Sequence, residues 1–335
     1  MQATATPANG PNADEQHLRS WQTRIFWLLW SAYAAYYLCR VNFAVAQPLI
    51  LKEFPTWTSA QIGTIPSTYA IFYAIGQMVN GTLCARFGTR RMITVALLFA
   101  ATTNLLFSFA TSFNAMLVLW AINGCAQSAG WSLIIQTIAN WTTSKRRGTV
   151  VGLISTCYTV GNVLSWLLAG QLCESVGWRA AFWVPSLILF PLALVFYTFL
   201  RNSPEEAGLP PVRDDGHDHT PAKDKTASTT APAELSTAEI FRITFSNRIL
   251  WILGIGFFCM NAVRYSFMNW SVQYMADFQG RTIKGSAFTA VAIPLIGSLG
   301  AIVWCCISTA CPVTSNSVSI PRCLCDPLPI GQYSS

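Results

Sequence analysis

The segment from Trp27 to Leu51 constrains the fold of this chain more than any other. It is long and apolar enough to cross a bilayer, and it carries a full positive charge, Arg40, near its middle. An arginine at that depth costs at least about 2.5–3.5 kcal/mol to insert, so its side chain should face a bundle interior or a watery cavity. Tyr33 and Tyr37 lie seven and three positions before Arg40, on the same face of a helix. We therefore predict a stripe of phenol hydroxyls beside a buried guanidinium.

The same pattern occurs a second time. The segment from Trp251 to Met275 is equally apolar and carries its own arginine, Arg264. Arg264 lies 13 positions after Trp251, and Arg40 lies 13 positions after Trp27. An internal repeat of a charged membrane-spanning helix is typical of transporters that are built from two related halves.

Composition supports a membrane protein. Of the 335 residues, 53% are hydrophobic and 10% are charged, whereas soluble chains average about 25% charged. Basic residues occur in short clusters between the apolar segments, so the net charge of +7 indicates topology and excludes nucleic acid as the expected partner. The partner that this composition predicts is the lipid bilayer. Eight segments of near-membrane length stand out, at 25–50, 61–84, 92–112, 115–138, 148–172, 180–200, 249–275 and 286–304.

These segments divide the chain into regions. We expect a disordered N-terminus over residues 1–23, a six-helix bundle over 24–200, a polar linker over 201–247 and a partial second bundle over 248–304. With the N-terminus inside, fourteen Lys and Arg residues fall in the inner segments and four in the outer ones. The excess predicts that the N-terminus and the linker are cytosolic.

The turn after the second apolar segment carries a family signature. Gly81 to Arg91 resembles the G-x-x-x-D-R-x-G-R-R gating loop of the major facilitator superfamily, with Ala85 at the usual acidic position. The resemblance implies an all-α membrane protein with the major facilitator fold, of which this chain holds about eight of twelve spans. It also implies a gating role for the loop residues that match the signature, which are Gly81, Arg86, Gly88, Arg90 and Arg91.

Several separated motifs narrow the resemblance. The segments 36–44, 123–131, 203–210 and 264–271 resemble the organophosphate:phosphate antiporters, the glycerol-3-phosphate and hexose-phosphate transporters. That family implies inward transport of a phosphorylated small molecule across the cell membrane in exchange for inorganic phosphate. It implies alternating access, with the phosphate held between Arg40 and Arg264, and neither enzyme activity nor a cofactor.

The residues themselves support an anion site. None of the eight apolar segments contains Asp or Glu, so Arg40 and Arg264 need an anion to neutralise them, and arginine binds phosphate in a bidentate manner. The alternative is that backbone carbonyls and tyrosines satisfy both arginines. Further cavity candidates are Tyr69, Tyr73 and Gln77 at helical spacing on the second span and Tyr158 on the fifth. The family commonly has lysine at the position of Gln77, and its glycerol-3-phosphate members have histidine at that of Tyr158.

Polar and small residues suggest how the helices pack. Asn123 and Gln127, one turn apart, should form hydrogen bonds between helices, with a substrate contact as the alternative. Small residues should permit close helix packing, at Gly130, Gly152, Gly161 and Gly170.

Other readings stay open at this point. Some family members are membrane receptors that bind a sugar phosphate and report it to a sensor kinase, and a facilitator for other organic anions is a third possibility. The residues do not select one phosphate ester. Residues 305–335 hold five cysteines where a second gating loop is expected, which favours a frameshift or truncation over a genuine tail or a metal-binding cluster. On that reading we expect the chain to transport poorly.

Overall fold

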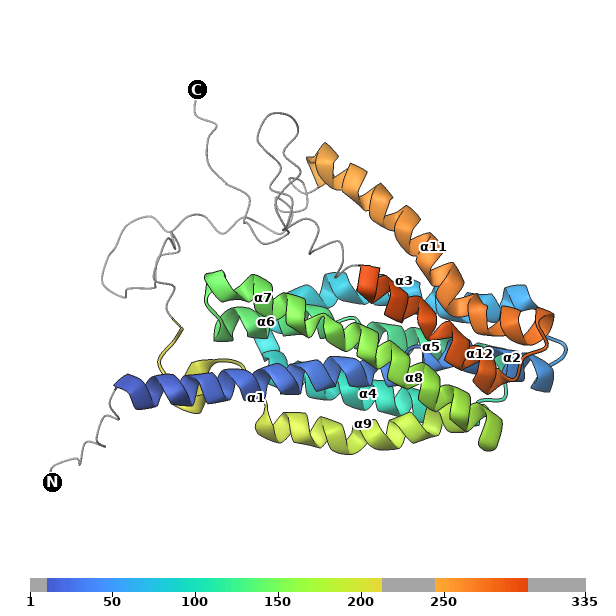
Figure 1. Ribbon diagram of the computed structural model, residues 1–335, viewed down its shortest axis with the longest axis horizontal. Helices are drawn as coiled ribbons and strands as arrows, with labels where there is room; N and C mark the ends of the chain where they lie inside the picture. The colour runs from blue at the N-terminus through green and yellow to red at the C-terminus, as the bar shows by residue number, and fades with distance from the viewer. Residues whose placement is uncertain (1–10, 213–244, 301–335) are drawn as a thin grey trace.

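The described part of the chain is helical throughout. The computed structural model describes residues 11–212 and 245–300, without the side chains of residues 11–14, 81, 82 and 84–86. Most helices run along one long axis (Figure 1). They are α1 (Pro11–Leu38), α2 (Asn42–Glu53), α3 (Ser59–Phe87), α4 (Thr89–Phe109), α5 (Phe113–Gln127), α6 (Gly130–Trp141), α7 (Ser144–Ile154), α8 (Thr156–Ser175), α9 (Ala180–Phe199), the 3-10 turn η1 (Pro204–Ala207), α11 (Arg248–Phe278) and α12 (Ile283–Ala290).

The N-terminal helix is longer than expected. Residues 11–23, which we expected to be disordered, lie in α1. The amide of Gln22 donates to the carbonyl of Trp141 at 2.7 Å, and the ring of Trp21 stacks on that of Trp141 with centroids 6.1 Å apart. These contacts hold the helix at Trp21 and Gln22 against the end of α6.

In the part of the chain that the structure describes, six helical segments are long and apolar enough to cross a membrane. They are Thr89–Phe109, Phe113–Trp141, Ser144–Ser175, Ala180–Phe199, Arg248–Phe278 and Ile283–Gly300. The first two expected spans are not among them. The first divides into α1 and α2 at Arg40, and α3, although 29 residues long, carries Ser, Thr, Gln and Asn along its length.

Glycines set several of the helix contacts. A Cβ at Gly161 of α8 would lie 2.9 Å from the Ala34 carbonyl oxygen in α1, and one at Gly130 would lie 3.1 Å from the ring of Tyr36. At Gly170 it would lie 2.8 Å from the Cβ of Ala287 in α12. The packing prediction is thus confirmed at these three positions. It is wrong at Gly152, where a Cβ would meet no atom within 4 Å.

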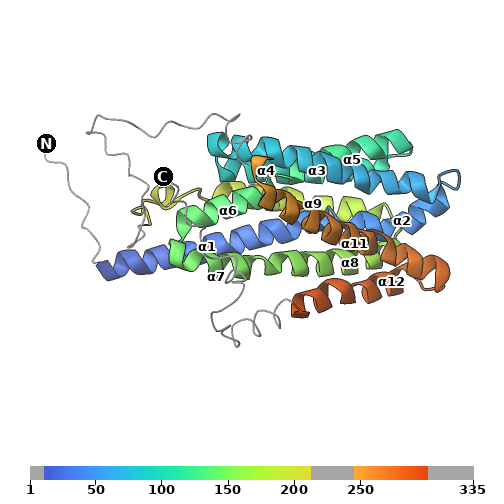
Figure 2. The same cartoon turned by 90° about the horizontal axis from the view of Figure 1, so that it is seen from above.

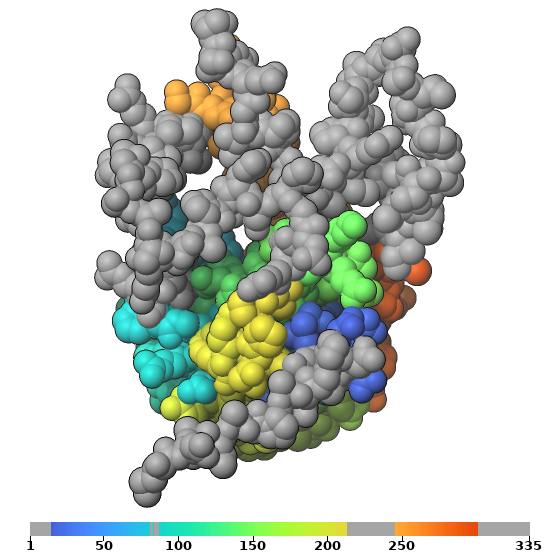
Figure 3. Space-filling model, turned by 90° about the vertical axis from the view of Figure 1, so that its left-hand side faces the viewer, coloured from blue at the N-terminus to red at the C-terminus, as the bar shows by residue number. Residues whose placement is uncertain are grey.

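The start of the expected linker packs on the bundle. Leu209 is buried in the same core as α1, and Asn202 accepts a hydrogen bond from the backbone N–H of Arg90 at 2.8 Å. Figure 3 shows this segment in yellow, between α1 in blue and the α3–α4 region in cyan. Residues 201–212 are therefore not a free linker. The rest of the expected linker and the tail at 305–335 lie outside the described residues.

The last two helices contact the bundle unequally. Figures 1 and 2 show α12 alongside α8, and Figure 1 shows α11 leaving the bundle toward its own N-terminal end. Buried residues of α11 occur only near its C-terminal end, at Met268, Val272, Gln273 and Met275. There the amide of Gln273 meets that of Gln47 in α2. Earlier in α11 the apolar side chains are open, as at Phe258, which is 74% exposed.

Candidate functional site

The site begins at a break in the first expected span. Between α1 and α2, residues 39–41 form a turn, and the carbonyl of Cys39 has left the helical pattern. That carbonyl accepts three side-chain amide N–H groups, from Asn123 at 2.8 Å and from Asn104 and Gln127 at 3.1 Å each. A buried carbonyl without partners would be costly, so these amides stabilise the break. We call Asn104, Asn123 and Gln127 the amide clamp.

Arg40 lies within this break and is held along one edge. Its Nε donates to the hydroxyl of Tyr69 at 2.6 Å and to Oε1 of Gln127 at 3.1 Å. Its Nη1 lies 3.5 Å from the hydroxyl of Tyr37. The guanidinium carbon also lies 4.7 Å from the ring centroid of Tyr73, within the range of a cation–π contact.

The far end of the same guanidinium is unsatisfied. Nη2 of Arg40 is buried and has no hydrogen-bond partner among the described residues. A charged donor in that position is expensive unless a ligand or water accepts from it. The site therefore presents an unused, charged N–H donor.

Arg264 reaches the site from the other half of the chain. Its guanidinium carbon lies 4.5 Å from the ring centroid of Tyr158 in α8. The Tyr158 ring in turn meets that of Tyr37 edge-on, with centroids 5.3 Å apart, and Tyr37 lies beside Arg40. Two tyrosine rings thus connect the two arginines.

Two other expected site residues lie elsewhere. Tyr33 is buried one layer away from Arg40, with its ring 5.6 Å from that of Tyr37 and 5.4 Å from that of Trp131. Gln77 is exposed and forms no hydrogen bond within the described part of the chain. Residues four apart on a helix differ in direction by about 40°. Gln77 lies eight positions after Tyr69, so its side chain points away from the face of α3 that carries Tyr69.

Gln127 and Asn104 contact the site or its helix break, and neither was expected there as a cavity residue. The cavity candidate Tyr69, one turn before Tyr73, contacts Arg40 directly. Gln127 had been assigned to helix packing, which is confirmed by its bond to Cys39, but it also contacts Arg40 directly. Asn104 offers no signal in the sequence, because nothing along the chain indicates that α4 approaches the α1–α2 break.

No carboxylate balances this site within residues 11–212 and 245–300. The ion pairs of that part of the chain are Arg19–Glu15 and Arg179–Glu53, and neither involves Arg40 or Arg264. Nor does that part hold a group of three His, Cys, Asp or Glu side chains placed to bind a metal ion. The charge of the site is therefore positive.

The Glu53 pair lies at one end of the bundle, beyond the first expected span. Arg179 donates to both carboxylate oxygens of Glu53, at 2.7 and 2.8 Å, and the indole N–H of Trp178 donates at 2.6 Å. These hydrogen bonds, with those from Arg179 the larger effect, lower the pKa of Glu53. The pair ties the end of α2 to the start of α9.

The expected gating loop is almost entirely helical. Gly88 alone separates α3 from α4, with a φ of 74° that favours glycine. The guanidinium of Arg90 lies 5.3 Å from the ring centroid of Tyr197 in α9, and Arg91 is exposed. Gly81 and Arg86 lie in α3, but their side chains are outside the described set. The turn therefore contacts its own half through α9 and Asn202.

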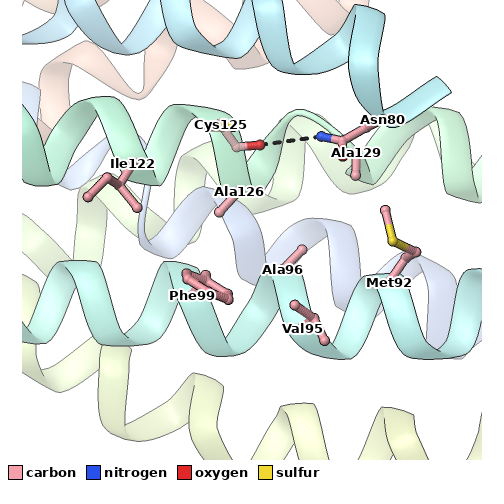
Figure 4. A pocket seen from close by; sticks show the side chains of 9 residues that line it. All are labelled: Asn80, Met92, Val95, Ala96, Phe99, Ile122, Cys125, Ala126 and Ala129. Atoms are coloured by element: carbon pink, nitrogen blue, oxygen red, sulfur yellow. Dashed lines mark hydrogen bonds between the residues drawn. The ribbon is translucent and has the colours of Figure 1, made fainter. Parts of the chain in front are cut away.

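A separate groove lies outside the site. It has a volume of about 250 Å³ and is lined mostly by apolar side chains of α4 and α5, including Phe99 and Ile122 (Figure 4). Asn80 of α3 lies at its edge and donates to the Ser128 hydroxyl at 2.6 Å, beside the break between α5 and α6. Within the described residues, none of the side chains that line the groove forms a hydrogen bond or a ring contact with Arg40.

Comparison with known proteins identifies the family. The model of the Major Facilitator Superfamily matches residues 29–318. The chain belongs to the major facilitator superfamily. It is thus a multi-pass membrane protein of a transporter family and not an enzyme.

Several named transport and sensor proteins resemble the chain over most of its length. It is 29% identical to the probable hexose phosphate transport protein of Chlamydia pneumoniae, over 84% of this chain and 63% of that one. It is 30% identical to the membrane sensor protein UhpC of Salmonella typhimurium, over 89% and 67%. It is 26% identical to the glycerol-3-phosphate transporter of Bacillus subtilis, over 84% and 63%. The chain thus spans somewhat under two thirds of the transporters that it matches.

A solved structure shows the same fold. The crystal structure of a bacterial homolog of the human lysosomal transporter Spinster superimposes with a TM-score of 0.71 at 17% identity, over 90% of this chain and 64% of that one. The major facilitator fold expected from the sequence is therefore confirmed.

Proposed function

We propose that this chain binds the phosphate group of a small organic phosphate in a site built for exchange with inorganic phosphate across a membrane, with weak transport by the 335 residues as expected above. The observation that carries the proposal is the free Nη2 of Arg40, a buried charged donor with no carboxylate near it in the described residues. Phosphate offers several acceptor oxygens and matches the planar fork of a guanidinium. The relatives named as hexose phosphate and glycerol-3-phosphate transporters support the same ligand class.

In this proposal each residue has a part. Arg40 binds the phosphate from the N-terminal half, and Arg264 approaches it from the other half. Tyr37, Tyr73 and Tyr158 supply rings and hydroxyls to the cavity between them, with Tyr33 behind. Gln77, at an exposed position of α3, would contact the ligand only after the halves move together.

Exchange follows from the unpaired charges. Phosphate between Arg40 and Arg264 would neutralise both and draw the halves together, which lowers the barrier between the two open states. Without an anion the two positive groups disfavour closure. The gating turn at Gly81, Arg86, Gly88, Arg90 and Arg91 would act at the end of the bundle away from Glu53.

The excess of basic residues in one set of connecting segments supports an orientation. We propose a protein of the cell membrane, with a cytosolic N-terminus and with the segment between α9 and α11 also cytosolic. Cysteine labelling of Ser203→Cys with a membrane-impermeant maleimide in intact cells would test this. Labelling only after permeabilisation is expected, and labelling of intact cells would contradict the orientation.

Two assays on the 335-residue chain test the function. Calorimetric titration with inorganic phosphate and with glucose 6-phosphate measures binding, and proteoliposomes loaded with phosphate measure uptake of labelled phosphate. We expect both ligands to bind and to compete, and Arg40→Lys to abolish the heat signal. Equal binding by wild type and by Arg40→Lys would overturn the proposal. Uptake only into phosphate-loaded vesicles would support exchange.

A sensor is the second candidate, because the membrane sensor protein UhpC is 30% identical over most of this chain. A sensor would bind the same ligand through the same arginines and report it to a partner kinase. Binding without uptake, together with ligand-dependent activity of a co-expressed sensor kinase, would favour it.

A further inference from the structure

Gln127 contacts both the site and the helix break. Its Oε1 accepts from Nε of Arg40 at 3.1 Å and lies 3.3 Å from the hydroxyl of Tyr69. Its Nε2 donates to the carbonyl of Cys39 at 3.1 Å and to Oδ1 of Asn123 at 2.9 Å. The side chain is fully buried. One amide therefore fixes the backbone just before Arg40 and the near edge of its guanidinium together.

This arrangement decides which nitrogens of Arg40 can meet a ligand. A guanidinium can bind an oxyanion through Nε and one terminal nitrogen, or end-on through Nη1 and Nη2. Here Nε already donates to Tyr69 and Gln127. Nη1 has one long contact of 3.5 Å with Tyr37, and Nη2 has none among the described residues. The end-on geometry is the one that stays open.

The rest of the amide clamp holds the same backbone from other helices. Asn104 of α4 donates to the Cys39 carbonyl, and its Oδ1 accepts from Asn42 at 3.1 Å. Asn42 also donates to the carbonyl of Ala181 in α9 at 2.8 Å. The residues on both sides of Arg40 are thus fixed to three neighbouring helices.

We propose that Gln127 is a positioning residue of the anion site. With Asn104 and Asn123 it holds the α1–α2 break, and it occupies the Nε edge of Arg40, so that Nη1 and Nη2 receive the phosphate end-on. The inference rests on the proposed function, because it concerns the same arginine and the same ligand. It adds a residue that touches Arg40 and not the ligand.

Two substitutions separate positioning from structural support. Gln127→Met removes all four hydrogen bonds at similar volume, while Gln127→Glu keeps both acceptor contacts and places a carboxylate on Arg40. We expect Gln127→Glu to retain more thermal stability than Gln127→Met, because the ion pair with the buried guanidinium outweighs the repulsion of the second carboxylate oxygen from the Cys39 carbonyl and Oδ1 of Asn123. The affinity of Gln127→Glu for inorganic phosphate should nonetheless fall about 100-fold, compared with about tenfold for Gln127→Met, since the carboxylate competes with the ligand.

Asn80→Asp is the matched control. Asn80 also supports a helix break, through Ser128, but it does not contact Arg40. This variant should melt earlier and bind phosphate like the wild type. Titration calorimetry and melting of the full chain in detergent measure both properties for all four proteins.

The outcomes distinguish the two claims. If the wild type binds no phosphate, the proposed function fails, and this inference falls with it. If the wild type binds but affinity follows stability, so that Gln127→Met binds more weakly than Gln127→Glu, then Gln127 has only a structural part and the inference is overturned. Lower affinity in Gln127→Glu than in Gln127→Met, with Asn80→Asp unchanged, supports it.

Discussion

The two copies of the arginine-bearing segment have similar sequences and different structures. The first copy, 27–51, breaks at Arg40 into α1 and α2, whereas the second, 251–275, lies within a single unbroken helix, α11. Around Arg40, three amides from neighbouring helices take up the freed Cys39 carbonyl. Around Arg264 the helix is largely exposed. The side-chain amide of the nearby Asn261 donates to the backbone carbonyl of Phe257 in the same helix.

The difference shows that the break depends on the surroundings. A helix can open only where other groups satisfy the backbone that it releases. Arg40 is therefore a fixed donor within a built site, and Arg264 is a side chain on an unbroken helix that lies against the rings of Tyr158 and Tyr265.

The largest expected effect compares the two arginines. Arg40→Lys should lower the affinity for inorganic phosphate at least about 100-fold, because lysine lacks the paired donors and the Nε contacts. Arg264→Lys should lower it about tenfold, because that side chain is less constrained. Titration calorimetry on the full chain gives both values. A greater loss in Arg264→Lys would mean that the unbroken helix dominates binding.

The second prediction removes a clamp residue. Asn104→Leu leaves the Cys39 carbonyl and the Asn42 amide each one partner short, and it should destabilise the protein by about 1–3 kcal/mol. Asn261→Leu in α11, which loses a bond to its own helix alone, is the matched control and should change little. Thermal melting in detergent measures both. Equal losses would show that the first copy is not specially stabilised.

A third pair tests close packing around each copy. Gly161→Ala places a methyl 2.9 Å from the Ala34 oxygen and 3.0 Å from Cβ of Tyr37, and should cost about 1–3 kcal/mol. Gly254→Ala in α11 meets no atom within 4 Å and should be neutral or stabilise by up to about 1 kcal/mol. If Gly161→Ala melts like the wild type, α8 does not press on α1 as described.

The smallest expected effect concerns the end of the first copy. The lowered pKa of Glu53 means that its ionised form stabilises the fold fully above the ordinary glutamate pKa. That contribution is lost as the pH falls through the lowered value. Glu53→Gln should therefore melt slightly earlier at neutral pH and show a weaker fall in melting temperature on acidification. An identical acid profile in the variant would contradict the assigned role of the Arg179 contact.

The sequence predicts the fold class and the two arginines well, because charge within an apolar segment is rare and the repeat is visible. It also predicts Tyr37, Tyr73 and Tyr158 as neighbours of the arginines. The break at Cys39 and the contact with Asn104 could not be predicted, since both depend on which helices pack together. Gln77 was expected in the cavity because it continues the spacing of four residues that relates Tyr69 to Tyr73. Each such step rotates the side chain by about 40°, so Gln77 no longer faces the cavity.

The most direct test of the account measures contact between phosphate and Arg40. Solid-state NMR on the full chain with nitrogen-15-labelled arginine and bound inorganic phosphate reports dipolar coupling between guanidinium nitrogens and phosphorus. We predict coupling to Nη1 and Nη2 that Arg40→Lys removes, with a smaller part removed by Arg264→Lys. Coupling that survives Arg40→Lys unchanged would place the anion elsewhere and contradict the account.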